Sequence, residues 1–256
     1  MIHGIDVSSA QATGADWKAA FDSGVRYAWI KASEGNTGRD PAYRKHLEAA
    51  SLAGVWCGAY HFCRPNFGGV IVSASQRQAA LERDAKTEAQ NFWQACAGWG
   101  RQSESLPPLL DVESFDSQLT SQEFVEWIHT FAAECTQLWD VLPVIYTGAP
   151  MRERGGKYWD SALWLAQYPL MIAAYPYGNG PRVGGLPAPL TLAEAERRAP
   201  PSLKPWAKTT VWQFSGGSMD LRGNTCAGFG SVPIDRSVAY VDSLDELRLV
   251  CKSLDA

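Results

Sequence analysis

The sequence predicts an α/β fold, a single irregular (β/α) barrel of the TIM type with eight strands and fewer helices in its second half. Short runs rich in β-branched and aromatic residues alternate with longer amphipathic or alanine-rich stretches, which is typical of parallel βα units. These runs number eight, the number that a closed barrel needs. The 256 residues, of which 46% are hydrophobic, can bury one substantial core, so residues 1–256 are expected to form one domain.

The expected elements follow one another along the chain without an internal repeat. The β-rich runs predict strands at residues 3–8, 27–32, 55–62, 108–113, 143–147, 163–167, 210–214 and 232–235. Amphipathic stretches between the early strands and at the end of the chain predict helices at residues 16–23, 41–52, 76–97, 121–138 and 243–253. Ser121 is the expected N-cap of the fourth of these helices.

Residues 169–207 differ in composition from the segments around them. They are rich in proline and glycine, which predicts a long loop insertion that holds a short helix at residues 191–198. The second half of the barrel is therefore expected to be irregular.

Composition excludes several classes of partner. The formal net charge is −4, and the lysines and arginines are scattered between acids, so no basic stripe is available for nucleic acid. No run approaches about 20 apolar residues, so no membrane insertion is expected. The first residues lack the basic and apolar regions of a secretion signal, which predicts synthesis in the cytoplasm. The six cysteines form no CxxC or Cys/His pattern, so they are interpreted as buried hydrophobic residues and no metal is expected.

Acidic residues fall where strands are expected to end. Asp6 lies near the end of the first strand, Asp111 and Glu113 end the fourth, and Asp235 ends the eighth. The carboxyl ends of barrel strands meet at one rim, where barrel enzymes hold their reacting groups. The pattern therefore predicts four carboxyl groups around one mouth.

Asp111 and Glu113 form the most informative pair. Two residues apart on an extended strand, they project to the same face with Cα atoms about 6.6 Å apart. Glycosidic cleavage needs a carboxylic acid that protonates the leaving oxygen and a second negative group near the oxocarbenium-like centre. Glu113 is assigned as the acid because its longer side chain reaches further, whereas Asp111, Asp6 and Asp235 hold charge, orient substrate or position water. A structural acid pair remains the alternative for Asp111 and Glu113.

Several ordered motifs resemble those of family 25 glycoside hydrolases, the Chalaropsis-type lysozymes. The resemblance runs from residue 2 to about residue 240 and depends on the motifs together. They are GIDVS at 4–8, WIKASEG at 29–35, GAYHF at 58–62, LDVE at 110–113, VIYT at 144–147, LWLAQY at 163–168 and VWQFS at 211–215.

The resemblance implies N-acetylmuramidase activity, which is hydrolysis of the β-1,4 bond from N-acetylmuramic acid to N-acetylglucosamine in bacterial peptidoglycan. It implies no metal or organic cofactor. Glu113 resembles the family's proton donor, and Asp6, Asp111 and Asp235 match its other acids. The expected substrate contacts, three of which match aromatic groove residues of the family (Tyr60, Tyr146 and Trp164), are Trp29, Lys31, Glu34, Tyr60, Phe62, Tyr146, Trp164, Gln167 and Gln213.

Some assignments stay open at this level. Lys31 and Glu34 are equally interpreted as a rim ion pair or as substrate contacts, and His61 is interpreted as a structural histidine. Ser237 stands where the family usually has Asn, and the 169–207 loop looks longer than usual, which makes Asp235 the least certain site. Backbone spacing does not decide between retention, inversion and participation of the substrate's acetamido group.

Other readings make different predictions. A chitinase-like barrel would need acids at positions 106 and 109, where this chain has Leu106 and Leu109. A barrel that binds cell-wall glycan without cutting it, or that serves a larger assembly, would bind walls without releasing reducing ends. Acting on a cell wall without a signal fits a monomeric phage-type endolysin, although an exported bacterial toxin fits the same physics.

Overall fold

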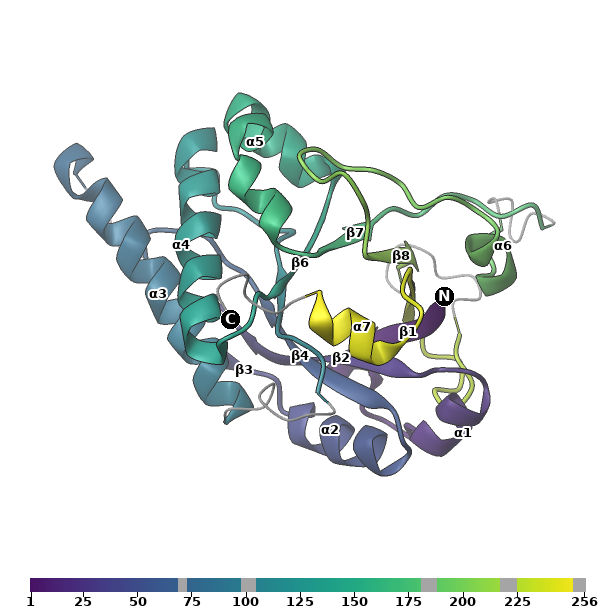
Figure 1. Cartoon of the computed structure of the whole chain (residues 1–256). Helices are drawn as coiled ribbons and strands as arrows, with labels where there is room; N and C mark the ends of the chain where they lie inside the picture. The colour runs from purple at the N-terminus through teal and green to yellow at the C-terminus, as the bar shows by residue number, and fades with distance from the viewer. Residues whose placement is uncertain (69–72, 98–104, 181–187, 217–224, 251–256) are drawn as a thin grey trace.

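Eight strands close into a barrel in the computed structural model, which describes residues 1–68, 73–97, 105–180, 188–216 and 225–250 (Figure 1). The barrel strands are β1 (Ile2–Val7), β2 (Tyr27–Glu34), β4 (Trp56–Phe62), β5 (Leu109–Asp111), β6 (Val144–Gly148), β7 (Leu170–Ala173), β8 (Val211–Ser215) and β9 (Asp235–Ala239). Their order around the barrel is β1-β9-β8-β7-β6-β5-β4-β2, and β2 pairs with β1 to close it. The short β3 (Gly38–Arg39) pairs with the end of β2. The predicted eight-stranded α/β barrel is confirmed.

Helices cover the outside of the barrel unevenly. They are α1 (Trp17–Asp22), α2 (Tyr43–Leu52), α3 (Arg77–Cys96), α4 (Ser121–Trp139), α5 (Ala149–Ser161), α6 (Leu192–Glu196) and α7 (Leu244–Leu249). In Figure 1, α3, α4 and α5 line one flank, whereas the described part of the connection from β7 to β8 holds the short α6 as its one helix. The prediction of fewer helices in the second half of the barrel agrees with this arrangement.

The core has two shells because strand residues point alternately outward and inward. The outward residues pack under the helices, as Ile30 and Ile145 do. The inward residues form a separate apolar cluster that fills the amino-terminal half of the barrel, with Leu109, Val144 and Met171 among them. At the carboxyl-terminal rim the inward positions become polar, so the apolar interior is the floor of the mouth.

Two glycines make room for large aromatic rings inside the barrel. A Cβ on Gly4 would lie 2.0 Å from the Tyr27 ring, and one on Gly58 would lie 2.6 Å from the Trp29 ring. Trp29 is therefore fully buried, and its indole N–H donates to the Pro107 carbonyl at 3.0 Å. This tryptophan packs the barrel floor.

One predicted strand is wrong. Residues Leu163–Gln167 form a 3-10 helix, and the strand follows as β7 within the segment that was predicted to be a loop insertion. Leu170–Ala173 is a short apolar run whose signal was hidden by the proline-rich composition around it. The 169–207 segment thus contains one barrel strand as well as α6.

The eighth strand also differs from its prediction. It spans Asp235–Ala239 rather than residues 232–235, and it runs antiparallel to both β8 and β1. Asp235 consequently begins its strand. Because the strand is reversed, its first residue lies at the same rim as the last residues of the parallel strands.

The helix boundaries bring two further corrections. The N-cap of α4 is Thr120 rather than Ser121, and its hydroxyl accepts from the Glu123 amide in a capping box. Helix α5 was not predicted, since Gly155 and Gly156 lower helix propensity and Gly156 has a positive φ of 55°.

The remaining expectations from composition concern cysteines and the membrane. Cys57, Cys63, Cys96, Cys135 and Cys226 are all buried thiols, as predicted, and Cys251 lies outside the described residues. Within the described ranges, no helix has the length and apolar character to span a bilayer.

Candidate active site

Four carboxyl groups lie at the carboxyl-terminal rim. Asp6 near the end of β1 is directly paired in register with Asp235 at the start of β9, so both side chains face the interior. Asp111 is the last residue of β5, and its side chain is buried. Glu113 lies two residues beyond that strand and is exposed. The structure therefore brings all four predicted acids to one mouth.

A chain of hydrogen bonds connects Asp6 with Glu113. The side-chain amide of Gln213 donates to Asp6 Oδ2 at 2.9 Å, and its Oε1 accepts from the Tyr146 hydroxyl at 2.9 Å. That hydroxyl also lies 3.5 Å from Glu113 Oε2. Gln213 and Tyr146 thus hold two acids that come from opposite sides of the barrel.

Tyr175 completes this network, and sequence reasoning missed it. Its hydroxyl donates to Gln213 Oε1 and lies 3.1 Å from the Tyr146 hydroxyl. The residue follows β7 by two positions, so it occupies the rim position of that strand. Correct placement of β7 was the signal that would have found it, because an aromatic residue just beyond a strand end points into the mouth.

Burial and mutual repulsion raise the proton affinity of the acids. Burial raises the pKa of Asp6 well above its ordinary value, although the Gln213 hydrogen bond opposes this. For Asp111, burial and then the charge of Glu113 raise the pKa in the same way. The pKa of Glu113 is raised by burial and then by Asp235, and lowered by its contact with Tyr146. The cluster therefore holds protons at pH values where free carboxylic acids are ionised.

Within the acid cluster, one buried carboxyl oxygen lacks a hydrogen-bond partner among the residues that the structure describes. Asp111 Oδ1 lies buried without a hydrogen bond among the described residues. A buried polar atom of this kind costs free energy and calls for an explanation. Its position on the floor of the acid cluster is consistent with a partner that belongs to a bound ligand.

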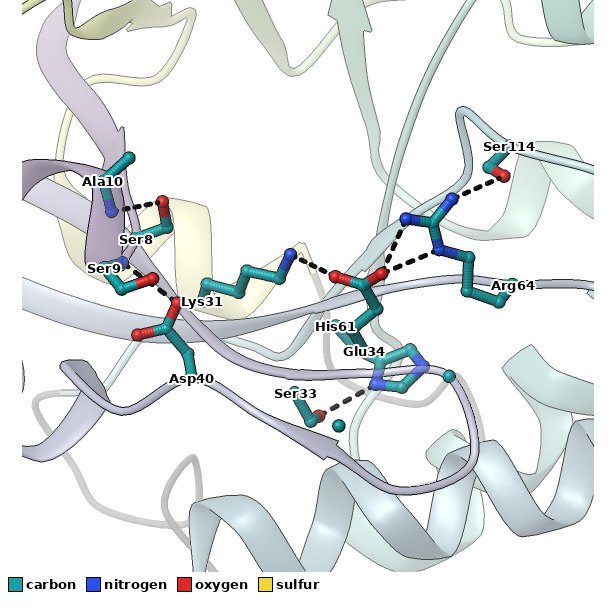
Figure 2. Close-up of polar contacts among 12 residues, drawn as sticks. Ser8, Ser9, Ala10, Lys31, Ser33, Glu34, Asp40, His61, Arg64 and Ser114 are labelled. Atoms are coloured by element: carbon teal, nitrogen blue, oxygen red, sulfur yellow. Dashed lines mark hydrogen bonds and ion pairs between the residues drawn. The ribbon is translucent and has the colours of Figure 1, made fainter.

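Lys31 and Glu34 form the rim ion pair that was one of their two interpretations. Lys31 Nζ lies 2.6 Å from Glu34 Oε2, and Arg64 Nη2 lies 2.6 Å from Glu34 Oε1 (Figure 2). Phe62 lies beneath both cations, with Lys31 Nζ 4.8 Å and the Arg64 guanidinium 4.3 Å from its ring centroid. Arg64 was not among the predicted site residues. Substrate contact by Lys31, Glu34 and Phe62 stays a prediction.

Other predicted substrate contacts lie in different places. Tyr60 is half-buried, and burial followed by the charge of Asp111 raises its pKa, which places its hydroxyl near the acids. Trp164 and Gln167 belong to the 3-10 helix that precedes β7, hence to the opposite end of the barrel. Trp164 packs on His129 of α4 at a centroid distance of 4.5 Å. The structure does not bring Trp29, Trp164 or Gln167 to the mouth.

A buried polar layer supports the rim from the side of α3. His61 Nδ1 lies 2.8 Å from the Ser33 hydroxyl, and His61 Nε2 lies 2.8 Å from Glu88 Oε2, with all three side chains fully buried. Glu88 Oε2 also accepts the backbone N–H of Arg64 at 3.0 Å. Burial lowers the pKa of His61 to about 3 and raises that of Glu88 to about 8. The prediction of a structural His61 agrees with this environment.

Glu88→Ala is expected to destabilise the fold by roughly 2 kcal/mol or more near pH 5, because it leaves His61 Nε2 and the Arg64 N–H buried without partners. The raised pKa means that the contribution of Glu88 is complete below about pH 4.5 and is lost as the pH rises through about 8. Urea unfolding should therefore show a smaller difference between the two proteins at pH 8 than at pH 5. Glu82→Ala on the exposed face of α3 is the matched control, and an equal effect of both changes would contradict the role of Glu88.

Metal ligation was not expected for this chain. Over the ranges that the structure describes, no three or more His, Cys, Asp or Glu side chains group in a way that could hold a metal ion.

Comparison with known proteins places the chain beside glycan hydrolases. The model of glycosyl hydrolases family 25 matches residues 5–221. Lysozyme M1 of Streptomyces globisporus is 30% identical over 69% of this chain, which spans 58% of that protein's length. N,O-diacetylmuramidase of Chalaropsis sp is 26% identical and is covered over 88% of its length, with 84% of this chain covered. The structure of a muramidase from Trichobolus zukalii superposes with a TM-score of 0.68 at 25% identity, covering 98% of this chain and 99% of that one.

Proposed function

The chain belongs to family 25 of the glycosyl hydrolases, and from this premise we propose that it is a lysozyme of the N-acetylmuramidase type. It hydrolyses the β-1,4 bonds between N-acetylmuramic acid and N-acetylglucosamine in bacterial peptidoglycan. The similarity to Lysozyme M1 and to the Chalaropsis N,O-diacetylmuramidase supports this substrate. The observation that carries the proposal is Glu113, a residue that reaches solvent at the mouth while its carboxyl group is desolvated by its surroundings, so that burial and then the charge of Asp235 raise its pKa.

Glu113 acts as the general acid. A raised pKa keeps the carboxyl protonated closer to neutrality, so that it can transfer its proton to the oxygen of the leaving sugar. The Tyr146 hydroxyl, 3.5 Å from Glu113 Oε2, orients the carboxyl and can stabilise its ionised form after the transfer. The proton donor thus lies just beyond β5, and the group that stabilises its conjugate base lies on the adjacent strand β6.

The other acids stabilise positive charge and position reactants. Asp6, fixed by Gln213, and Asp111 lie deeper than Glu113 and face the place where the oxocarbenium-like centre of the sugar develops. Asp235 lies opposite Asp6 and contributes charge that raises the pKa of Glu113. Tyr60 and Tyr175 provide the aromatic walls against which sugar rings pack.

Digestion of purified peptidoglycan with mass analysis of the fragments tests the reaction. The expected products carry N-acetylmuramic acid at their reducing ends. Reducing-end N-acetylglucosamine would identify a glucosaminidase instead, anhydro ends a lytic transglycosylase, and free peptides an amidase or peptidase. Binding to walls without any released ends would support the non-catalytic alternative.

Asp235→Asn is expected to shift the alkaline limb of the pH–rate profile to lower pH. The negative charge of Asp235 raises the pKa of Glu113, so its removal lets Glu113 lose its proton at a lower pH. Rates of reducing-end release between pH 4 and 9, which are about the limits of carboxyl titration in proteins, measure this shift. Asp245→Asn in α7, on the far side of the barrel, is the control. A limb that stays in place or moves upward would contradict the coupling.

Two finer predictions concern how the enzyme acts in nature. We propose that it acts as a monomer and that it is a phage-type endolysin, the assignment made from the sequence. Light scattering of the purified protein tests the first. Lysis of intact cells only when a membrane-permeabilising protein is added tests the second.

A further inference from the structure

Arg64 presents a solvent-facing guanidinium that is nevertheless held in place. Its side chain is 48% exposed, yet Nε and Nη2 donate to Glu34 Oε1 at 2.8 and 2.6 Å. The same group stacks on the Phe62 ring and donates from Nη1 toward the Ser114 hydroxyl at 3.4 Å (Figure 2). Fixing a long side chain in this way removes most of the entropy that binding would otherwise cost. The guanidinium still has outward N–H groups for a ligand, because only three of its five N–H bonds are directed at these partners.

The positive charges around Glu34 outnumber its one negative charge. Glu34 is shared between Arg64 and Lys31, whose Nζ lies 2.6 Å from Glu34 Oε2, so two cations surround one carboxylate. Figure 2 shows this carboxylate between the two cationic groups. These three side chains together therefore carry a net positive charge beside an otherwise acidic mouth. Both cations lower the pKa of Glu113, which places them within electrostatic reach of the general acid.

Arg64 lines a groove that includes the residue after Glu113. The groove has a volume of about 500 Å³. Its lining includes five polar or charged side chains and one exposed aromatic ring, together with Pro65 and Gly68; these side chains are Asn36, Arg64, Asn66, Ser114, Asp116 and Phe115. Ser114 directly follows Glu113 in the chain, so the groove starts beside the general acid. This volume is enough for a small portion of a ligand. A polar groove next to the site of cleavage is a place where a substituent of the glycan can lie.

Both walls of the groove are hydrogen-bonded to buried carboxyl groups of α3. Asn36 Nδ2 donates to Asp84 Oδ1 at 2.7 Å, and the Asn66 backbone N–H donates to Asp84 Oδ2 at 3.2 Å. The backbone N–H of Arg64 is bound by Glu88 on the next turn of the same helix. The loops after β2 and β4 are therefore fixed from below, and Arg64 is carried by a rigid support.

From these observations we propose that the Arg64 groove binds a carboxylate carried by the muramic acid residue of the substrate, either on its stem peptide or, where the peptide has been removed, on its lactyl group. The inference rests on the proposed muramidase function and adds to it a determinant of substrate recognition. A muramic acid unit differs from a glucosamine unit in its lactyl ether, whose carboxyl group joins the stem peptide through an amide, and in the free carboxyl groups of that peptide. A fixed guanidinium beside the cleavage site distinguishes the two by charge and by bidentate geometry.

Arg64→Gln tests this contact on two forms of the same substrate. One is purified peptidoglycan, and the other is peptidoglycan whose carboxyl groups have been converted to amides with carbodiimide and ammonia. On the native form we expect kcat/KM to fall about tenfold, the effect of losing one charge-assisted hydrogen bond. On the amidated form the variant and the wild type should be equal. A loss of the same size on both forms, or no loss on the native form, would overturn the proposal.

The control variant is Arg77→Gln. Arg77 has the same local arrangement as Arg64, with a two-pronged contact to Glu123 and a Phe67 ring 4.4 Å from its guanidinium, but it does not line the groove. Its replacement should leave the ratio of kcat/KM between the two substrates unchanged. A change of that ratio as large as the one in Arg64→Gln would show that any lost arginine produces the effect.

A third substrate separates the two sources of the carboxylate. An amidase hydrolyses the amide between the lactyl group and the stem peptide and so frees the lactyl carboxylate. An effect of Arg64→Gln on these stripped strands therefore shows that the groove accepts the lactyl carboxylate. Loss of the effect there assigns the contact to the stem peptide. If wild-type protein releases no reducing ends from any substrate, the proposed function fails. In that case the groove proposal is tested by sedimentation of the wild type and Arg64→Gln with native and amidated walls. Weaker binding of the variant to native walls alone would support it, and equal binding of the two proteins to native walls would overturn it.

Discussion

Glu113→Gln is expected to lower the rate of reducing-end release from peptidoglycan by about 10²-fold or more, the lower end of what the loss of a general acid costs. The amide has the same shape as the carboxyl, and its contact with Tyr146 can persist. It cannot, however, give a proton to the leaving sugar. The expected change is therefore in kcat, with wall binding retained, as measured by initial rates and by sedimentation with insoluble peptidoglycan.

A glutamate far from the mouth provides the comparison for this variant. Glu126 lies on α4, where it accepts from Gln122 at 2.7 Å, and Glu126→Gln should keep the full rate. Retention of more than about a tenth of the wild-type rate in Glu113→Gln would be inconsistent with general acid catalysis at this position. Loss of binding in parallel with the rate would indicate a role in holding substrate.

Asp111→Asn is expected to produce the second large loss, about 10²-fold in kcat, in the range seen when a preorganised electrostatic group is removed. Asp111 is buried at the end of β5, its pKa is raised by burial and by Glu113, and its Oδ1 has no hydrogen-bond partner among the described residues. Such a carboxyl contributes unfavourably to folding unless a ligand or reaction intermediate uses it. Activity should thus fall while stability is maintained.

Thermal unfolding of Asp111→Asn at pH 7 checks the second half of this expectation. The amide removes a group whose ionisation is opposed by burial and by a neighbouring charge, so the midpoint should equal or exceed that of the wild type. A lower midpoint together with a normal rate would support the alternative of a structural acid pair. An unchanged rate would remove Asp111 from the chemistry.

Local sequence patterns were sufficient where neighbouring residues determine the structure. The alternation of β-rich and amphipathic runs located seven of the eight barrel strands to within a few residues, and it located α1 to α4 in the same way. The position of Asp6 and Asp111 at strand ends followed from those runs alone. The failures were also local in origin: proline and glycine hid β7 and α5, so Tyr175 was missed and Trp164 was placed on a strand it does not belong to.

By itself, then, the sequence determined the α/β barrel, the family resemblance and the four acids, because each depends on residue types and spacings within short segments. The tertiary structure decided which side chains lie next to one another in the site. Strand β9 pairs antiparallel with β1, which sets Asp235 opposite Asp6. Closure of the barrel also brings together Gln213 of β8, Tyr146 of β6 and Tyr175, which follows β7. The tertiary structure also pairs Arg64 with Glu34 and buries Trp29 in the interior of the barrel, below the mouth. These outcomes depend on pairing and packing between residues far apart in the chain, and such non-local contacts leave no periodic signal in the sequence.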